Sequence, residues 1–342
     1  MDLGLTPEQE QLVAAFAGLY AKHASPERVR AAEPLGFDKA LWEQLVELGA
    51  LAMAVAESAG GWGASPVDLA LVAEQHGRFV APAPLIDAQV AARLLARLDG
   101  ATAAGTLASA LAGDRLVTFA LHPARDGRAR LVPAAAVADD AIVLEGERLL
   151  LVSLVDARTA VENLGSMPVA DVAIGSDAVV LATGSAAVDA FEIALDDFLF
   201  LTAAALVGIG TRALEIGVEY VKERKAWGVP IGSFQAVAHR LADCATALDG
   251  ARLLAYEAAW AVTDDPERSA ELAAMAFAFA YEAARDATAR SLHFHGGYGF
   301  MMEYDVQLFY RRARGWANVF AEPRLVYRRV ADKRYGRIEA AS

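Results

Sequence analysis

The spacing of apolar residues predicts helices in the first third of the chain. Leu12, Phe16 and Tyr20 recur at four-residue intervals, which places their side chains on one face of a helix. Pro7 precedes this face, at a place typical of a first helical residue. Similar patterns follow, so we expect an N-terminal helical domain over residues 1–112.

The pattern changes after this first part. Residues 113–195 contain short runs rich in β-branched residues, separated by Gly, Asp and Pro, which predict a middle antiparallel β-domain. No helix-length pattern lies between these runs, so a doubly wound α/β sheet is not expected. Long helical patterns return over residues 196–342 and predict a C-terminal four-helix bundle. The expected fold is a multidomain α and β protein in the order α, β, α.

Composition narrows the class of protein. Hydrophobic residues make up 56% of the chain, and the predominance of alanine among them favours tightly packed helices. The net charge of −13 argues against a nucleic-acid-binding surface, because phosphate contacts need clustered Lys and Arg. Basic residues nevertheless gather in the last fifty positions, Arg314 among them, and favour a local anion site on an acidic protein.

Cysteine usage and the N-terminal sequence point to a cytoplasmic protein. Cys244 is the one cysteine, so no disulfide can form within the chain and a cysteine-based zinc site is excluded. The N-terminus lacks the basic and apolar regions of a signal peptide. No stretch of about 18 residues is apolar without interruption, so we expect no membrane span.

The segment RKAWGVPIGSFQ, residues 224–235, has two interpretations. A helix ends at a basic pair that includes Arg224, Trp227 makes a corner with a glycine, and Phe234 and Gln235 start the next helix. The first interpretation is a connection between helices with solvated basic residues. The second is an anion site, with a guanidinium fork, an aromatic face and an amide near a helix start. The residues alone favour neither.

The segment HFHGGYGF, residues 293–300, follows a long helical pattern. Gly296 and Gly297 are typical of a helix C-cap, and they also suit a place where backbone N–H groups face a phosphate. His293 and His295 are a weak indication of a metal. No third ligand with matching spacing follows, and residues two apart do not share a helical face, so no metal site is expected.

The segment GIGTRA, residues 208–213, has the beginning of a dinucleotide-binding fingerprint. Such a fingerprint needs a strand before it, a helix after it and further βαβ units around it. Here a helical pattern runs through the glycines and no βαβ unit follows. We therefore interpret Gly208 and Gly210 as small residues at a close contact between helices.

Three segments together resemble the acyl-CoA dehydrogenase family. They are AESAGGWGASPVDLALVAEQHGR, YVKERKAWGVPIGSFQAVAHRLADCATAL and HFHGGYGFMMEYDVQLFYRRA. The resemblance covers nearly the whole chain and agrees with the α, β, α order. The chain is shorter than usual and is most similar to compact actinobacterial members, some of which form mixed tetramers with a related subunit.

The resemblance implies an FAD-dependent enzyme. FAD would lie between the middle domain and the C-terminal bundle, and the glycine pair would approach the FAD of a partner subunit. The positions that match the family's FAD contacts are Arg224, Trp227, Phe234, Gln235, His293, Gly296 and Gly297. The implied reaction is α,β-dehydrogenation of an acyl-CoA thioester, with electrons passed to an electron-transfer flavoprotein from a homo- or hetero-tetramer.

The chain departs from the family pattern at three places. His293 stands where the family usually has glutamine, and FALHPARDG, residues 119–127, replaces the usual flavin- and substrate-binding loop of the middle domain. The two positions where the family carries its catalytic glutamate align with Phe320 and Phe198, and a phenyl ring cannot accept a proton. Glu322 is the remaining candidate base, and it reaches a substrate only if its segment is not helical, since two residues turn about 200° around a helix.

Four hypotheses remain open at this point. The chain is a flavoprotein subunit whose partner supplies the base, or it uses Glu322 or another acid of its own. Alternatively it is a structural or regulatory subunit that has lost flavin. The fourth hypothesis is a flavin-dependent oxidase or monooxygenase on the same fold.

Overall fold

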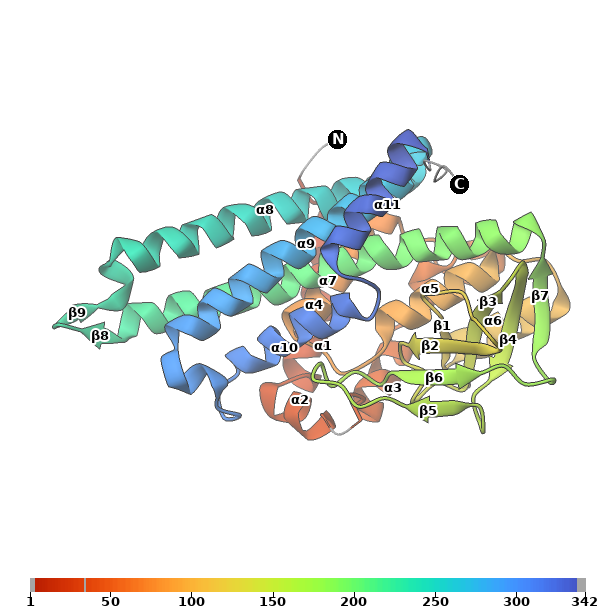
Figure 1. Cartoon of the computed structure of the whole chain (residues 1–342), viewed down its shortest axis with the longest axis horizontal. Helices are drawn as coiled ribbons and strands as arrows, with labels where there is room; N and C mark the ends of the chain where they lie inside the picture. The colour runs from red at the N-terminus through yellow and green to blue at the C-terminus, as the bar shows by residue number, and fades with distance from the viewer. Residues whose placement is uncertain (1–3, 34, 337–342) are drawn as a thin grey trace. The chain divides into compact units, whose positions relative to one another are not determined.

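The computed structural model (Figure 1) describes residues 4–33 and 35–336. Contacts between Cα atoms divide the chain into two compact units. The helical unit comprises the described residues of Met1–Pro26, Ala70–Ala81 and Leu199–Ser342. The mixed unit comprises those of Glu27–Leu69 and Pro82–Phe198. The three-domain division expected from the sequence stays a prediction.

Helices fill the first part of the chain, as the apolar spacing predicts. The first begins at a capping box, in which the Thr6 hydroxyl accepts from the Gln9 N–H and the Gln9 side chain accepts from the Thr6 N–H. The α-helices are α1 (Pro7–His23), α2 (Pro26–Ala32), α3 (Lys39–Glu47), α4 (Pro66–Arg78), α5 (Leu85–Ala96) and α6 (Ala101–Ala112), with the short 3₁₀ helices η1 (Ala52–Ala54) and η2 (Glu57–Ala59).

Two small sheets form the middle of the chain, and one of them is mixed rather than antiparallel. The strands are β1 (Val117–Phe119), β2 (Arg128–Val132), β3 (Asp140–Glu145), β4 (Arg148–Ser153), β5 (Arg158–Ala160), β6 (Ala170–Ala173) and β7 (Val179–Thr183). Their orders are β1-β3-β4-β7 and β2-β6-β5. β1 pairs with β3 in parallel because β2, which lies between them in sequence, belongs to the other sheet. The expectation of an all-antiparallel domain was wrong in this detail.

Long helices return after the sheets. They are α7 (Ser185–Glu223), α8 (Gln235–Asp264), α9 (Pro266–Phe294), α10 (Val306–Asn318) and α11 (Pro323–Tyr335). The short elements between them are β8 (Lys225–Ala226), β9 (Val229–Pro230), η3 (Ile231–Ser233) and η4 (Gly296–Phe300). The last helical region predicted from the sequence is two helices, because the chain leaves helical geometry between residues 319 and 322.

Close packing around α7 explains the glycines that imitate a dinucleotide fingerprint. A Cβ at Gly208 would lie 2.0 Å from the Glu74 carbonyl oxygen of α4. A Cβ at Gly210 would lie 2.5 Å from a Leu248 methyl of α8 and 3.1 Å from the Ala284 Cα of α9. The interpretation of these glycines as helix-contact residues is confirmed.

A partly buried charge network joins α4, α7 and α8. The Glu74 carboxylate of α4 accepts from Arg252 Nε at 3.0 Å and from the Tyr256 hydroxyl at 2.7 Å, both on α8. Arg252 also donates to the Thr211 hydroxyl of α7 at 3.0 Å. The pairing satisfies a carboxylate that would otherwise be costly to bury.

Helix α7 is long and apolar enough, by length and composition, to cross a membrane. The sequence analysis did not expect such a stretch. Within the structure, 89% of this apolar window is buried. The packing of the core therefore accounts for its hydrophobicity.

Replacing Gly208 by alanine tests the close contact of α7 with α4. A methyl group would meet a backbone carbonyl that cannot rotate away, so we expect Gly208→Ala to destabilise the protein by about 1–3 kcal/mol. Gly105 is the matched control, because it lies exposed on α6 with open space at its Cβ position. Gly105→Ala should stabilise by about 0.5–1 kcal/mol through helix propensity. Urea denaturation followed by circular dichroism measures both changes, and equal effects would contradict the packing described.

Candidate functional site

An exposed tryptophan sits at the tip of a tight hairpin after α7. Strands β8 and β9 pair antiparallel, and the two residues between them, Trp227 and Gly228, have φ of 52° and 83°. Two consecutive residues with positive φ are the signature of a type I′ turn. For a bulky residue this conformation costs roughly 1–2 kcal/mol. The side chain of Trp227 is also 90% exposed, so it gains little within this chain from its strained position.

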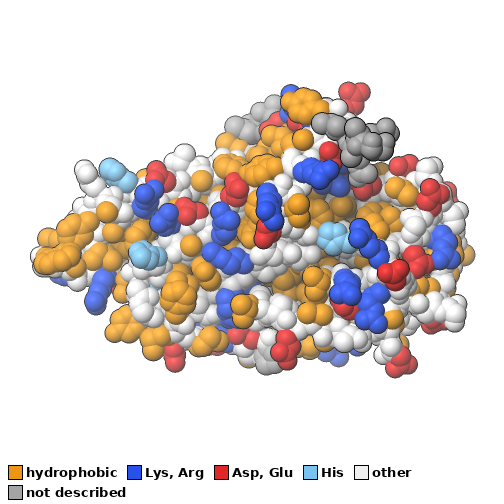
Figure 2. Space-filling view, in the orientation of Figure 1, with side chains coloured by type: hydrophobic (Ala, Val, Ile, Leu, Met, Phe, Trp, Pro, Cys, Tyr) orange, Lys and Arg blue, Asp and Glu red, His pale blue; other side chains and the backbone are white. Residues whose placement is uncertain are grey.

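Arg224, Phe234 and Gln235, which also match FAD contacts of the family, lie next to this hairpin in the chain. The Trp227 ring meets the Phe234 ring edge-on, with centroids 5.8 Å apart. Phe234 is the N-cap residue of α8 and Gln235 is the first residue of that helix. Arg224 closes the hairpin through its carbonyl, which accepts from the Ile231 N–H at 2.8 Å. Hydrophobic side chains gather over this tip of the molecule (Figure 2).

The glycine pair forms an open turn after α9. Gly296 has φ of +61°, which favours glycine, and no atom lies within 4 Å of its Cβ position. Gly297 has an ordinary φ and the same open space, so nothing within the chain requires glycine there. Gly299 differs, because a Cβ there would lie 2.4 Å from the Leu292 carbonyl oxygen. The turn therefore packs on α9 through Gly299 and offers bare backbone to an external group at Gly297.

The two histidines of this segment differ in exposure and in contacts. His293 is exposed on the last turn of α9. His295 is only 5% exposed, and its Nδ1 donates to the Ser291 carbonyl at 2.7 Å. Its ring stacks on Tyr220 of α7, with centroids 4.0 Å apart. Because Tyr220 lies one turn before Arg224, this stack joins the glycine turn to the end of α7 that carries the hairpin.

The residues of the hairpin and the glycine turn fit a flavin dinucleotide. A pyrophosphate needs cationic and backbone N–H donors, which Arg224 and the glycine turn provide. Planar rings need aromatic faces, which Trp227 and Phe234 provide. The open space at the Gly297 Cβ position would let a ligand approach the backbone there. The assignment of each residue to a contact stays a prediction.

The first of the two expected base positions lies in an aromatic contact. Phe320 is half-buried, and its ring meets Phe277 of α9 edge-on at 5.6 Å between centroids. Phe277 is fully buried. This apolar pair presents no group that could accept a proton.

The second position is apolar as well, and its acidic neighbour is already paired. Phe198 is 4% exposed. The preceding Asp197 forms ion pairs with Arg93 Nε at 2.9 Å and with Arg97 Nη1 at 2.7 Å. Burial raises the pKa of the Asp197 carboxyl, but the two arginines outweigh that effect and hold it below its usual range. The carboxylate therefore stays ionised and engaged in anchoring α7 to α5.

Glu322 lies outside helical structure. This is the condition under which the sequence analysis expects its side chain to reach a substrate. It is the N-cap residue of α11, with φ of −68° and ψ of 149°. Its side chain is 64% exposed and lies 3.2 Å from Arg324. Its role as a catalytic base stays a prediction.

The replacement loop of residues 119–127 is held against the sheet. Ala120 and Ala124 donate backbone hydrogen bonds to Ile142 and Leu144 of β3. His122 points its side chain away from the core and is exposed. The loop thus keeps a fixed backbone without the threonine, acid and serine of the usual family pattern.

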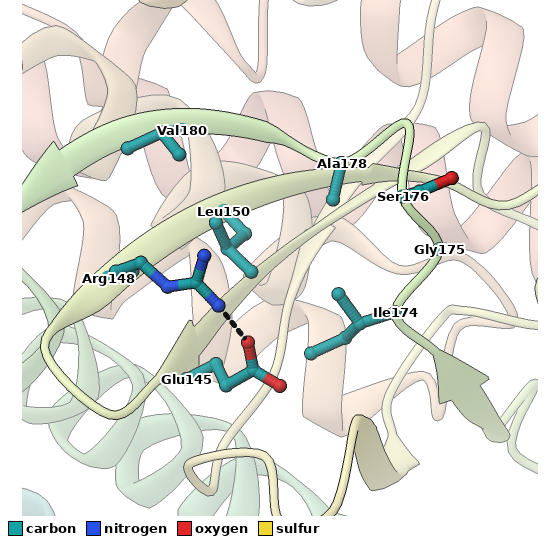
Figure 3. A pocket seen from close by; sticks show the side chains of 8 residues that line it. All are labelled: Glu145, Arg148, Leu150, Ile174, Gly175, Ser176, Ala178 and Val180. Atoms are coloured by element: carbon teal, nitrogen blue, oxygen red, sulfur yellow. Dashed lines mark hydrogen bonds and ion pairs between the residues drawn. The ribbon is translucent and has the colours of Figure 1, made fainter.

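A shallow hollow in the mixed unit has no counterpart among the sequence motifs (Figure 3). Its volume is about 330 Å³, and it lies between the β3–β4 turn, β4, β7 and the loop that precedes β7. An ion pair of Glu145 with Arg148 closes one end, and Leu150, Ile174 and Val180 contribute apolar surface. The charges satisfy each other and Ser176 is the one hydroxyl among the lining side chains, so the hollow holds no catalytic constellation.

Comparison with known proteins identifies the family. The model of the acyl-CoA dehydrogenase N-terminal domain matches residues 6–113, and that of the C-terminal domain matches residues 193–317. Acyl-CoA dehydrogenase IpdE2 of Mycolicibacterium smegmatis is 33% identical over 329 residues, which cover 95% of this chain and 98% of that protein. IpdE2 of Mycobacterium tuberculosis is 32% identical, with coverage of 96% and 98%.

Solved structures of related proteins have the same fold as this chain. The ChsE4–ChsE5 complex of Mycobacterium tuberculosis matches with a TM-score of 0.88 and 28% identity, covering 97% of this chain and 98% of that one. The Tcur3481–Tcur3483 steroid ACAD variant matches with a TM-score of 0.85 and 27% identity, covering 95% and 97%. The expected fold class and the resemblance are confirmed. The chain belongs to the acyl-CoA dehydrogenase family of FAD-dependent oxidoreductases, which act on CH–CH donors.

Proposed function

We propose that this chain is the FAD-binding subunit of a heteromeric acyl-CoA dehydrogenase whose partner chain supplies the catalytic base. The observation that carries the proposal is the contrast between two parts of the helical unit. The hairpin and glycine turn keep an exposed aromatic, a cation and bare backbone. The segment expected to carry the base presents Phe320, packed on Phe277.

The chain's own residues would position the cofactor and exclude water. Bound FAD would supply the acceptor for the hydride that leaves the β-carbon of the acyl group. Arg224 would neutralise phosphate charge, while Trp227 and Phe234 would hold a ring system by stacking. The apolar contact of Phe277 with Phe320 would keep water away without moving a proton. The carboxylate that removes the α-proton would come from the partner.

The relatives support a mixed assembly. Two of the solved structures that match this chain are described as pairs of different proteins, ChsE4 with ChsE5 and Tcur3481 with Tcur3483. We propose a tetramer of two such chains and two partner chains, located in the cytoplasm and active in lipid metabolism. Reduced flavin would pass its electrons to an electron-transfer flavoprotein.

Reaction of the purified chain with acyl-CoA thioesters tests this proposal. The chain should be co-expressed with dehydrogenase genes that neighbour its own, and also purified alone, and both preparations loaded with FAD. We expect acyl-CoA-dependent bleaching of the flavin absorbance in the complex and none above background in the lone chain. The panel should include a steroid-derived acyl-CoA, since one solved relative is a steroid enzyme. Full bleaching by the lone chain would contradict the partner requirement, and a protein that stays colourless with FAD would favour a flavin-free subunit.

Substitution of Glu322 separates a partner base from a base within this chain. If the partner supplies the carboxylate, Glu322→Gln should change the bleaching rate of the complex by less than about threefold, because Glu322 is an exposed cap residue. A general base lost from its own site would instead cost about 10²–10⁴-fold. Stopped-flow absorbance measures the rate, and the yellow colour of the variant confirms that FAD is retained.

Substitution of each glycine of the pair tests whether FAD lies close to this backbone. Gly297→Ala should leave the melting temperature nearly unchanged, since its φ is ordinary and its Cβ position is open. The added methyl should weaken FAD binding about tenfold or more by keeping the ligand from the backbone. Gly296→Ala should itself destabilise the fold by about 1 kcal/mol, because φ there is +61°. Fluorescence titration with FAD and thermal unfolding distinguish the two, and unaltered FAD affinity in Gly297→Ala would contradict the assignment.

A further inference from the structure

Two arginines from neighbouring helices lie together on the bundle, away from the residues assigned to the flavin. Arg314 of α10 is half-buried, and its guanidinium carbon lies 3.7 Å from the centre of the Tyr310 ring. Its Nη1 donates to the Tyr310 carbonyl at 3.1 Å. Arg285 of α9 is exposed, with its guanidinium carbon 5.9 Å from the centre of the Tyr281 ring. The Tyr310 ring restricts the plane of Arg314, whereas the contact of Arg285 is near the outer limit of about 6 Å for a cation–π interaction.

Across residues 4–33 and 35–336, neither arginine has a carboxylate within ion-pair distance. Other arginines of α9 and α11 do, at 3.3 Å for Arg290 with Asp286 and 2.6 Å for Arg334 with Glu271. The acid that precedes Arg285 by one turn, Glu282, accepts from the Tyr327 hydroxyl at 2.8 Å. Glu282 keeps its negative charge in this contact, but it forms no ion pair with Arg285 or Arg314.

A contact between α9 and α10 brings the two arginines onto the same part of the bundle. The Tyr281 hydroxyl of α9 donates to Asn318 Oδ1 of α10 at 2.9 Å, and Arg285 and Arg314 each lie one helical turn from this hydrogen bond. Burial has the largest influence on the pKa of Arg314 and lowers it. Tyr310 and Tyr281 raise this pKa, Arg285 lowers it again, and the result lies below the usual range for arginine. Both side chains remain charged because arginine does not deprotonate in proteins.

An uncompensated pair of this kind is unexpected in an acidic chain. The protein carries a net charge of −13, so acidic residues are abundant, yet among the described residues no acid forms an ion pair with Arg314. Lys and Arg side chains are visible over the bundle helices on the face shown in Figure 2. A half-buried charge without a counter-charge costs stability. An anion from outside the chain would remove that cost.

We propose that Arg285 and Arg314 form a binding site for a phosphate or pyrophosphate group. Each guanidinium can donate two parallel hydrogen bonds, and a tetrahedral phosphate carries enough oxygens and charge to accept from both. The ring and the carbonyl of Tyr310 hold the Arg314 fork in place before binding, which lowers the entropy lost on association. The site includes none of the residues proposed to contact FAD. Its occupant would be the phosphate part of a nucleotide-bearing ligand, such as a CoA thioester or a flavin dinucleotide.

Inorganic pyrophosphate is the probe that tests the site without any dependence on catalysis. Titration calorimetry at low ionic strength should show saturable binding to the wild-type chain. Arg314→Gln and Arg285→Gln should each weaken that binding about tenfold or more, as expected for loss of a charged hydrogen-bond donor. Arg268→Gln is the control, since Arg268 lies on α9 with Asp265 at 3.6 Å and should leave the affinity unchanged. Absence of saturable binding, or equal affinity in Arg314→Gln, would overturn the proposal.

Thermal unfolding gives a second readout that a purely structural arginine would not produce. In phosphate-free buffer Arg314→Gln should melt at the same temperature as the wild type or higher, because it removes a desolvated and repelled charge. Pyrophosphate should then raise the melting temperature of the wild type by a few degrees and leave the variant unchanged. A variant that melts lower by the same amount in both buffers would show that Arg314 serves packing alone.

Free CoA and FAD distinguish the two sources of phosphate. The ligand whose affinity falls in Arg314→Gln, with Arg268→Gln unaffected, is the one that uses the site. Because these measurements need no turnover, they can succeed even if the dehydrogenase subunit proposed above proves inactive. They can also fail while flavin bleaching succeeds, so the two proposals are tested separately.

Discussion

The close backbone approach of α7 to its neighbours is the constraint on which the rest of the helical unit depends. Gly208 and Gly210 leave no side chain at the contacts with α4, α8 and α9, so these helices pack at distances that a single methyl would prevent. Farther along, Tyr220 stacks on His295 and fixes the turn after α9. The helix then ends at Glu223, and the next residue, Arg224, closes the hairpin of Trp227. One element thus holds both segments of the candidate site.

The family's chemistry needs residues for cofactor binding and a residue for proton transfer. This chain keeps residues suited to the first task and lacks the expected residue for the second. Features that would serve cofactor binding persist even where they cost stability, as with the strained and exposed Trp227. Features that would serve proton transfer are replaced by apolar packing at Phe320 and by a satisfied ion pair at Asp197. Strain that brings no gain within the chain is expected at functional positions. The pattern is that of a subunit specialised for binding, with part of the reaction left to another chain.

The sequence predicted most of the local structure and little of what depends on distant contacts. The corner at Trp227, the start of α8 at Gln235 and the open glycine turn all follow from residue types that favour particular backbone geometry. The difference between His293 and His295 could not be predicted, because it depends on Tyr220, far away in sequence. The parallel pairing of β1 with β3 likewise required knowledge of which sheet receives β2.

The arrangement of charged residues also could not be predicted from the sequence. Basic residues near the C-terminus indicated a local anion site, but the proposed joint site of Arg314 and Arg285 depends on the packing of α10 against α9, where Tyr281 bonds to Asn318. The identification of Phe320 and Phe198 as base positions came from the resemblance to the family rather than from any local pattern. The structure adds that their surroundings are apolar or already neutralised, which no alignment of motifs could show.

Exchange of the α-proton of an acyl-CoA with solvent deuterium tests the central claim most directly, since it reports proton abstraction itself. The lone chain, loaded with FAD and incubated with a thioester in deuterated buffer, should incorporate no deuterium above the rate of buffer alone. The complex with its partner should incorporate deuterium at the α-carbon, detected by mass spectrometry. Catalysed exchange by the lone chain would show that it carries its own base and would contradict the account.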